Sequence, residues 1–146
     1  MIKDTSKFKI EPYVMRVEKP WGFELIFSDG TAKVTSKILH VNKSKRSSLQ
    51  YHDEKEEILT LLSGDGILEL EDNNGEIKKF NMIPRKSYLI IPNQIHRFSA
   101  GNEDCEIMES STPESGNTVR IEDDYQRGVE TEDSRSKRTS NILYKG

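Results

Sequence analysis

The sequence predicts an all-β fold, a single barrel built from short strands. The chain has 146 residues, which is the length of one domain with a sizeable core. Its apolar residues occur in short alternating runs interrupted by turn signals, and no stretch of ten residues carries the apolar stripe of a helix. A closed barrel accounts for this pattern, because it buries alternate residues of each strand and leaves no free sheet edge.

Turn signals separate the predicted strands. Residues 28–30 form a turn after the first strand, and residues 72–75 are a hairpin signal because Asn and Gly tolerate positive φ. Residues 58–62 are almost all apolar, as in a strand buried on both faces, and we expect residues 64–66 to turn it into the next strand. The expected strands are 23–27, 32–41, 58–62, 67–71, 76–80, 87–91, 95–98 and 105–108.

The composition changes after residue 127. We expect residues 1–127 to form the barrel domain and residues 128–146 to form a polar C-terminal tail. Residues 128–140 are almost wholly polar and charged, which is typical of a segment that is solvated or that depends on a partner. Residues 142–144, Ile-Leu-Tyr, could dock on the barrel or on a second subunit, but a free terminus is the simpler expectation.

Composition excludes several classes of partner. The net charge is −3 with both signs interspersed, so there is no basic field for a nucleic acid. No apolar run approaches the ~18 residues of a membrane span, and the N-terminus lacks the apolar core of a signal peptide. The single cysteine, Cys105, rules out an internal disulfide and fits a reducing compartment. We therefore expect a cytoplasmic protein.

Four residues have the chemistry and spacing of a metal site. Gln50 and His52 are two apart, so on a strand their side chains point to the same face. Glu57 follows at a spacing that lets the next strand add a carboxylate, and His96 arrives on a distant strand. Two imidazoles, a carboxylate and an amide oxygen can hold one divalent ion with positions left open. The ligands are nitrogen and oxygen without thiolate, so zinc, manganese, iron, nickel and cobalt all remain possible.

These residues also carry a family resemblance. The pattern Gln-x-His-x4-Glu-x6-Gly from Gln50 onward, followed by a later His, resembles the two motifs of the cupin superfamily. The branch with Gln in the first position is the cupin domain of type II mannose-6-phosphate isomerases. Further motifs of that branch resemble residues 19–22 (Lys-Pro-Trp-Gly), 37–41, 46–52 and 91–98, and residues 111–114 and 119–127 resemble the C-terminal strand region of its short stand-alone members. The likeness therefore covers roughly residues 16–127.

The resemblance implies a metal-dependent isomerase that interconverts mannose 6-phosphate and fructose 6-phosphate, or a related sugar, through a cis-enediol. The metal would polarise the carbonyl, a base would move a proton between C1 and C2, and cations would bind the phosphate. Tyr51, Tyr88 and Glu69 are all conceivable bases, and the sequence does not choose among them. The candidate phosphate-binding residues are Lys37, Arg46, Arg97 and Arg120.

Two other functions fit the same residues, because cupins host many chemistries on one barrel. A non-catalytic cupin could bind a metal or a sugar and regulate a partner. A metal-dependent oxygenase is also possible, since a mixed nitrogen and oxygen ligand set permits Fe(II). For the oligomeric state, the resemblance implies a homodimer, paired through barrel faces or exchanged terminal strands.

Overall fold

The computed structural model describes residues 2–136 and the backbone of residues 140–145. It is almost entirely β-structure, with one five-residue helix in the described part of the chain. The elements are β1 Tyr13–Lys19, β2 Gly22–Ile26, β3 Thr35–Val41, β4 Leu49–His52, β5 Glu57–Glu71, β6 Ile77–Asn81, β7 Ser87–Ile90, β8 His96–Ser111, β9 Thr118–Glu122, α1 Glu132–Ser136 and β10 Ser140–Lys145.

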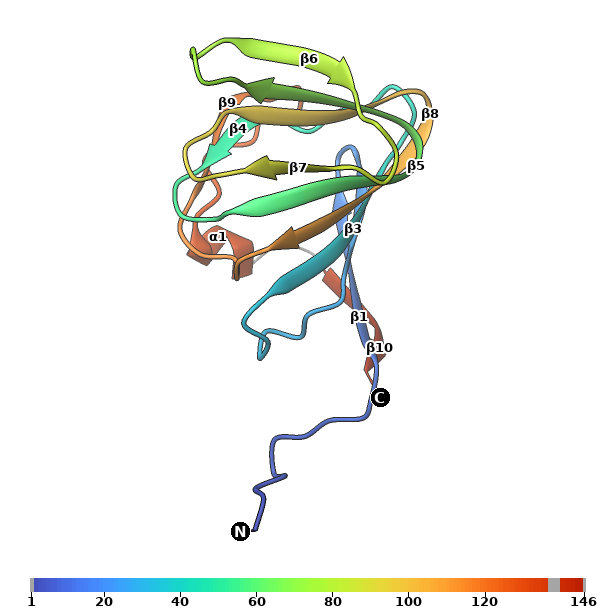
Figure 1. The fold of residues 1–146 in the computed structure, drawn as a ribbon, viewed down its shortest axis with the longest axis vertical. Helices are drawn as coiled ribbons and strands as arrows, with labels where there is room; N and C mark the ends of the chain where they lie inside the picture. Colours follow the sequence, from blue (N-terminus) through green and yellow to red (C-terminus); the bar gives the residue numbers. More distant parts are fainter. Residues whose placement is uncertain (1, 137–139, 146) are drawn as a thin grey trace.

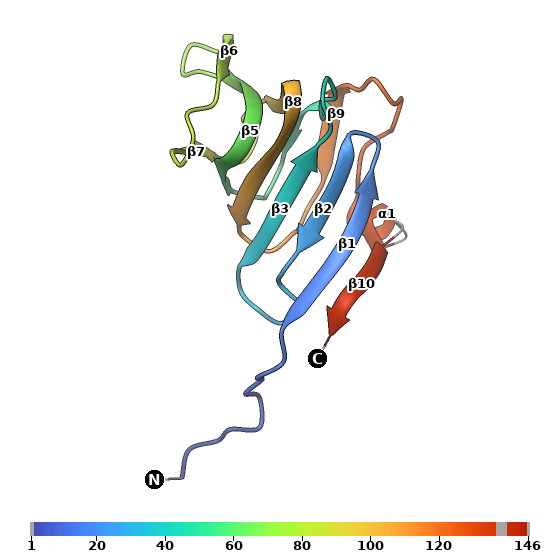
Figure 2. The same ribbon diagram turned by 90° about the vertical axis from the view of Figure 1, so that its right-hand side faces the viewer.

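The strands form one antiparallel sheet that curls around a common interior (Figure 1). Along one path the order is β10-β1-β2-β3-β8-β4-β9, and β5 adds itself to β8 while also pairing with β6 and β7. The long strand β8 is central because it pairs with β3, β4 and β5. Figure 2 shows β1, β2, β3 and β8 side by side, with β5, β6 and β7 curving away. The prediction of an all-β barrel is confirmed.

The structure corrects the turn that we expected at residues 64–66. β5 runs through this segment as one strand, and its register against β8 shifts on both sides of Gly64. Gly64 has φ +83°, and a Cβ there would lie 1.9 Å from the carbonyl oxygen of Asp104. The glycine therefore permits a bulge that bends a continuous strand against its neighbour, and the strand does not reverse.

The interior of the barrel has a polar half and an apolar half. Along β3 and β8, directly opposed inward residues change from polar to apolar in the order Thr35–Ser111, Lys37–Glu109, Leu39–Ile107 and Val41–Cys105. The apolar half continues into Trp21 and Phe98, whose rings meet edge to face with centroids 5.0 Å apart. Each large apolar side chain buried there contributes about 1.5–3 kcal/mol of folding free energy.

The outer face of β5 is less buried than its sequence suggests. Ile58 and Leu62 are each 40% exposed, whereas Leu59 and Leu61 between them face the core. Our expectation that residues 58–62 are buried on both faces is therefore wrong. The strand alternates as period 2 demands, because β5 belongs to an antiparallel sheet with one face to the core.

The segment expected to be a solvated tail lies against the barrel. Glu130 forms an isolated bridge with Thr118, α1 follows, and the backbone of β10 pairs with β1 (Figure 2). Ile142 and Tyr144 pair with β1 through their backbone, but the side chains of residues 142–144 lie outside the described part of the structure. Among the described residues, no helix has the length and apolar character needed to cross a membrane.

Candidate metal centre

Three predicted ligands meet inside the barrel, each brought by a different strand. His52 ends β4, Glu57 begins β5 and His96 begins β8, and all three side chains are buried. Glu57 Oε1 lies 3.0 Å from His96 Nε2 and 3.6 Å from His52 Nε2. One ligand atom from each residue lies within 4.8 Å of the others. The spacing is suitable for one ion bound by two nitrogens and a carboxylate oxygen.

A contact of Nδ1 orients the imidazole ring of each histidine. His96 Nδ1 lies 3.0 Å from the carbonyl oxygen of Gln94, which can only accept, so Nδ1 donates and Nε2 keeps its lone pair. His52 Nδ1 lies 2.9 Å from the hydroxyl of Thr118. Both Nε2 atoms are buried and have no hydrogen-bond partner among the described residues. Buried polar atoms are rarely left unpaired, and metal-binding histidines are oriented in this way by a second contact.

Gln50 lies beside the histidines, on the strand that carries His52. Its backbone pairs with His96, and its side chain lines the same pocket as His52 and Glu57. The amide oxygen accepts a hydrogen bond of 2.7 Å from the hydroxyl of Ser48. A carbonyl oxygen has two lone pairs, so this bond leaves one for a further partner. That Gln50 is a ligand stays a prediction.

The electrostatics keep the cluster in the protonation state that a metal requires. Burial, and then the charge of Lys55, lowers the pKa of His52 to about 4. Burial alone would raise the pKa of Glu57, but Lys55 and the contacts with His52 and His96 hold it well below its usual range. At neutral pH the histidine is therefore neutral and the carboxylate charged, as ligation needs.

A row of buried charges of alternating sign continues from Glu57 across the polar half of the interior. Lys55 Nζ lies 3.2 Å from Glu57 Oε2 and 3.4 Å from Glu109 Oε2. Lys37 Nζ lies 4.0 Å from Glu109 Oε2 and 3.4 Å from Glu24 Oε2. Because each charge has a partner of opposite sign, the row avoids the cost of an isolated buried ion.

The same row shifts the pKa of its members. Burial lowers the pKa of Lys37 and of Lys55, but the surrounding carboxylates outweigh it, and the pKa of each rises above its ordinary value. Burial raises the pKa of Glu109, and the two lysines offset this only in part. The row therefore supplies two permanent cations and one carboxyl group that takes a proton more readily than usual.

The structure separates the four predicted phosphate-binding residues into two pairs. Lys37 and Arg120 line the pocket that contains the metal cluster. Arg46 forms an exposed two-pronged ion pair with Asp124. Arg97 is buried away from the pocket, where its Nε donates to the carbonyl oxygen of Ser47. The strand alternation that places His96 inward turns Arg97 to the other face.

Sequence reasoning did not name several residues of this pocket, among them Lys55, Glu109 and Arg135. Lys55 lies within the motif from Gln50 to Glu57, where it takes the place of an arginine of the resembling family, but it was not named as a site residue, and Glu109 lies in no motif. Their inward position could have been found only from register, since Glu109 lies directly opposite Lys37. Arg135 lies in the supposed tail. None of the conceivable bases from the sequence, Tyr51, Tyr88 and Glu69, lines this pocket.

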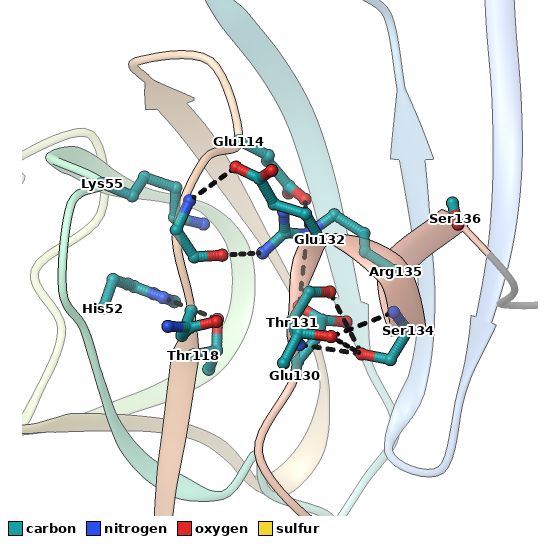
Figure 3. A network of polar contacts seen from close by, with 12 residues as sticks. His52, Lys55, Glu114, Thr118, Glu130, Thr131, Glu132, Ser134, Arg135 and Ser136 are labelled. Atoms are coloured by element: carbon teal, nitrogen blue, oxygen red, sulfur yellow. Dashed lines mark hydrogen bonds and ion pairs between the residues drawn. The ribbon is translucent and has the colours of Figure 1, made fainter.

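The C-terminal segment forms one wall of the pocket, and the space that remains is small. Figure 3 shows the side chain of Arg135 reaching from α1 toward Glu114, with His52 and Lys55 on the opposite side. The cavity volume is about 60 Å³. Typical ligand pockets measure roughly 300–1,000 Å³. As it stands, the site has room for an ion and a few water-sized groups.

Solved structures resemble this chain at low sequence identity. KdgF from Halomonas sp. is 17% identical with a TM-score of 0.55, over 66% of this chain and 82% of that one. Bacillus subtilis oxalate decarboxylase, described with Mn(II) centers, is 18% identical with a TM-score of 0.61, over 73% and 29%. The capsular polysaccharide assembling protein CapF from Staphylococcus aureus is 14% identical with a TM-score of 0.61, over 88% and 33%.

The fold is a cupin barrel. The chain spans most of KdgF but only about a third of oxalate decarboxylase and of CapF. At these identities the likeness establishes the fold and not the reaction. No protein-family model matches the sequence, and no curated protein is similar to it in sequence. The narrower resemblance to mannose-6-phosphate isomerases is carried by sequence motifs alone.

Proposed function

We propose that this chain is a metal-dependent cupin whose ion is held by Gln50, His52, Glu57 and His96. The observation that supports the proposal is the pair of buried Nε2 atoms, which face one carboxylate and have no hydrogen-bond partner among the described residues. Without an ion, both atoms would cost free energy on folding, because buried polar groups are normally paired. The Mn(II) centers described for oxalate decarboxylase are compatible with a divalent ion on this fold.

We further propose that the ligand is a sugar phosphate, and that the reaction interconverts mannose 6-phosphate and fructose 6-phosphate or a related sugar. Two cations of the pocket, Lys37 and Arg120, support a phosphate-bearing ligand. CapF, a capsular polysaccharide assembling protein, is a structural neighbour compatible with carbohydrate chemistry. A homodimer, as the family resemblance implies, remains part of this proposal.

The polar half of the interior supplies the groups that such an isomerisation requires. A bound divalent ion would act as the Lewis acid that polarises the sugar carbonyl. Glu109 is our candidate for the base that carries a proton between C1 and C2, because it lines the pocket and burial raises its pKa. Lys55 would hold Glu109 and Glu57 in place and donate hydrogen bonds to the ligand. This role for Glu109 replaces the three bases conceivable from the sequence.

Metal analysis of purified variants tests the site. We expect about one divalent ion per chain in the wild type, and loss of that ion in the double variant His52→Ala/His96→Ala. Gln50→Ala should weaken binding by about tenfold, in the range seen when one group at a metal site is removed. His40→Ala is the matched control, because His40 stacks on Phe23 at the surface of β3 and lies outside the pocket.

An assay of mannose 6-phosphate isomerisation by the metal-loaded protein tests the reaction. Turnover in the wild type that is lost in Glu109→Gln would support the isomerase and its base. Stoichiometric metal without turnover would leave a metal-binding cupin with another ligand or a non-catalytic role. Absence of metal after reloading would contradict the site itself.

A further inference from the structure

The four buried side-chain nitrogens without a hydrogen-bond partner in the described chain divide into two kinds. Two are the Nε2 atoms of His52 and His96 at the proposed metal, and two are the Nε atoms of Arg120 and Arg135. Both arginines line the same pocket as His52. A buried guanidinium with an unused donor is suited to an anion, because its N–H groups match carboxylate and phosphate oxygens. The pocket therefore has unused polar atoms at two places, at the two histidines and at the two arginines. We call the arginine end the mouth of the pocket.

The carboxylates that now lie beside Arg135 come from the protein itself. Arg135 Nε lies 3.5 Å from Glu130 Oε2 and 2.9 Å from Glu114 Oε2, yet it makes no hydrogen bond of good geometry to a described residue. The charge of Glu130 also acts on Arg120, whose Nη1 donates to the carbonyl oxygen of Gly128 at 2.6 Å. Glu130 is thus a carboxylate paired with Arg135, in the pocket that Arg120 also lines.

Residues 128–136, which we call the strap, are attached to the barrel by polar contacts. Glu130 and Thr118 exchange two backbone hydrogen bonds of 2.9 Å, and Arg135 Nη2 donates to the carbonyl oxygen of Gly116 at 3.3 Å. The helix α1 buries no residue. Segments with few buried apolar contacts open at a small fraction of the global unfolding free energy. Opening of the strap should therefore cost less free energy than unfolding of the barrel.

We propose that the strap is a movable wall of the site, and that Glu130 occupies the place of an anionic ligand group beside Arg135, in the pocket that Arg120 also lines. A phosphate monoester entering the pocket would displace the Glu130 carboxylate, and Arg135 would then bind the phosphate. Displacement also explains how a cavity of about 60 Å³ admits a sugar phosphate, since the strap supplies part of its wall. The inference rests on the proposed function only for the choice of phosphate as the anion.

The strap and the metal centre also share one residue. Thr118 bonds to Glu130 through its backbone and contacts His52 Nδ1 through its hydroxyl at 2.9 Å. Displacing the strap removes two of the hydrogen bonds that hold the strand carrying this hydroxyl. Entry of a ligand at the mouth would thereby change the contact that orients His52 toward the metal.

Binding of inorganic phosphate, measured by calorimetry, tests the proposal on the full chain. Glu130→Gln keeps the size of the side chain and its backbone bonds but removes the competing charge, so it should bind phosphate on the order of fivefold more tightly. Arg135→Ala should bind it about tenfold or more weakly, because a charge-assisted hydrogen bond is lost, and Arg135→Lys should restore part of the affinity. Glu18→Gln is the matched control, since Glu18 pairs with Arg16 outside the pocket.

Hydrogen exchange gives a second readout that does not depend on turnover. Saturating mannose 6-phosphate should speed exchange of the amides of Glu130 and Thr118, whereas neutral mannose should leave them unchanged. Thermal unfolding of each variant shows that it is folded. Equal phosphate affinity in wild type, Glu130→Gln and Arg135→Ala, or no phosphate binding at all, would overturn the proposal. If the variants change phosphate affinity as expected but mannose 6-phosphate is not isomerised, the proposal for the strap is supported and only the proposed reaction is contradicted.

Discussion

The apolar and polar halves of the barrel interior are built by the same strands, but they make different kinds of contact. On β3 and β8, Leu39 and Ile107 oppose each other in one half, and two residues further along Lys37 and Glu109 oppose each other in the other. The apolar pair needs only to be close-packed, whereas the charged pair must also be neutralised after it loses water. A buried row of charges is weak evidence for stability, because apolar residues of the same size often serve as well. The comparison indicates that the apolar half stabilises the fold, and it supports our proposal that the polar half is the functional site.

The largest expected effect comes from breaking the polar half at its centre. Glu109→Leu leaves Lys37 and Lys55 without the carboxylate that both approach, and we expect the free energy of unfolding to fall by about 3–5 kcal/mol. Chemical denaturation measures the change. The double variant Lys37→Met/Glu109→Leu should recover much of the loss, since it removes both charges. If the single variant were as stable as the wild type, Lys37 and Lys55 would not depend on Glu109 for charge compensation.

A cavity in the apolar half should cost nearly as much stability but spare the site. Ile107 is fully buried, so Ile107→Ala should lower the free energy of unfolding by about 2–5 kcal/mol. Its metal content should remain that of the wild type. Ile58→Ala is the matched control, because Ile58 is 40% exposed on the outer face of β5 and should lose far less. Loss of metal in Ile107→Ala would show that the two halves are not independent.

The smallest effect is a pH dependence confined to the polar half. The pKa of His52 is lowered to about 4 in the fold, so between pH ~6.5 and 4 the unfolded chain binds a proton that the folded chain does not. Stability from this residue is complete above pH ~6.5 and falls as the pH drops toward 4, by about 3 kcal/mol in total. Denaturation of the metal-free protein at pH 7, 6, 5 and 4 measures it. Equal pH slopes in wild type and His52→Gln would contradict this assignment.

The lowered pKa also refines an expectation from the sequence. Histidines with ordinary pKa values would lose a metal as the pH drops through ~6.5. In the structure, burial and Lys55 keep His52 neutral well below that pH, so protonation of His52 competes with the metal only in more acidic solution. The neighbours that cause this shift were not identifiable from sequence spacing.

Sequence patterns predicted the parts that depend on local period and spacing. The alternation of strands required an all-β barrel, and the two-residue step between Gln50 and His52 placed both side chains in one pocket. The five-residue step to Glu57 was enough to bring the carboxylate from the next strand to the histidines. These features survive because strand geometry fixes which face each residue takes, whatever the rest of the chain does.

Only the tertiary structure decided which distant residues meet. Lys37 and Glu109 are ordinary charges in the sequence, and the antiparallel register of β3 against β8 alone makes them a buried pair. Arg135 belongs to a segment whose composition is that of a solvated tail, yet ion pairs with Glu114 and Glu130 hold it at the mouth of the pocket. Composition reports how well a segment tolerates water. Whether such a segment instead finds partners depends on charges supplied by other strands, and these come together only when the barrel is folded.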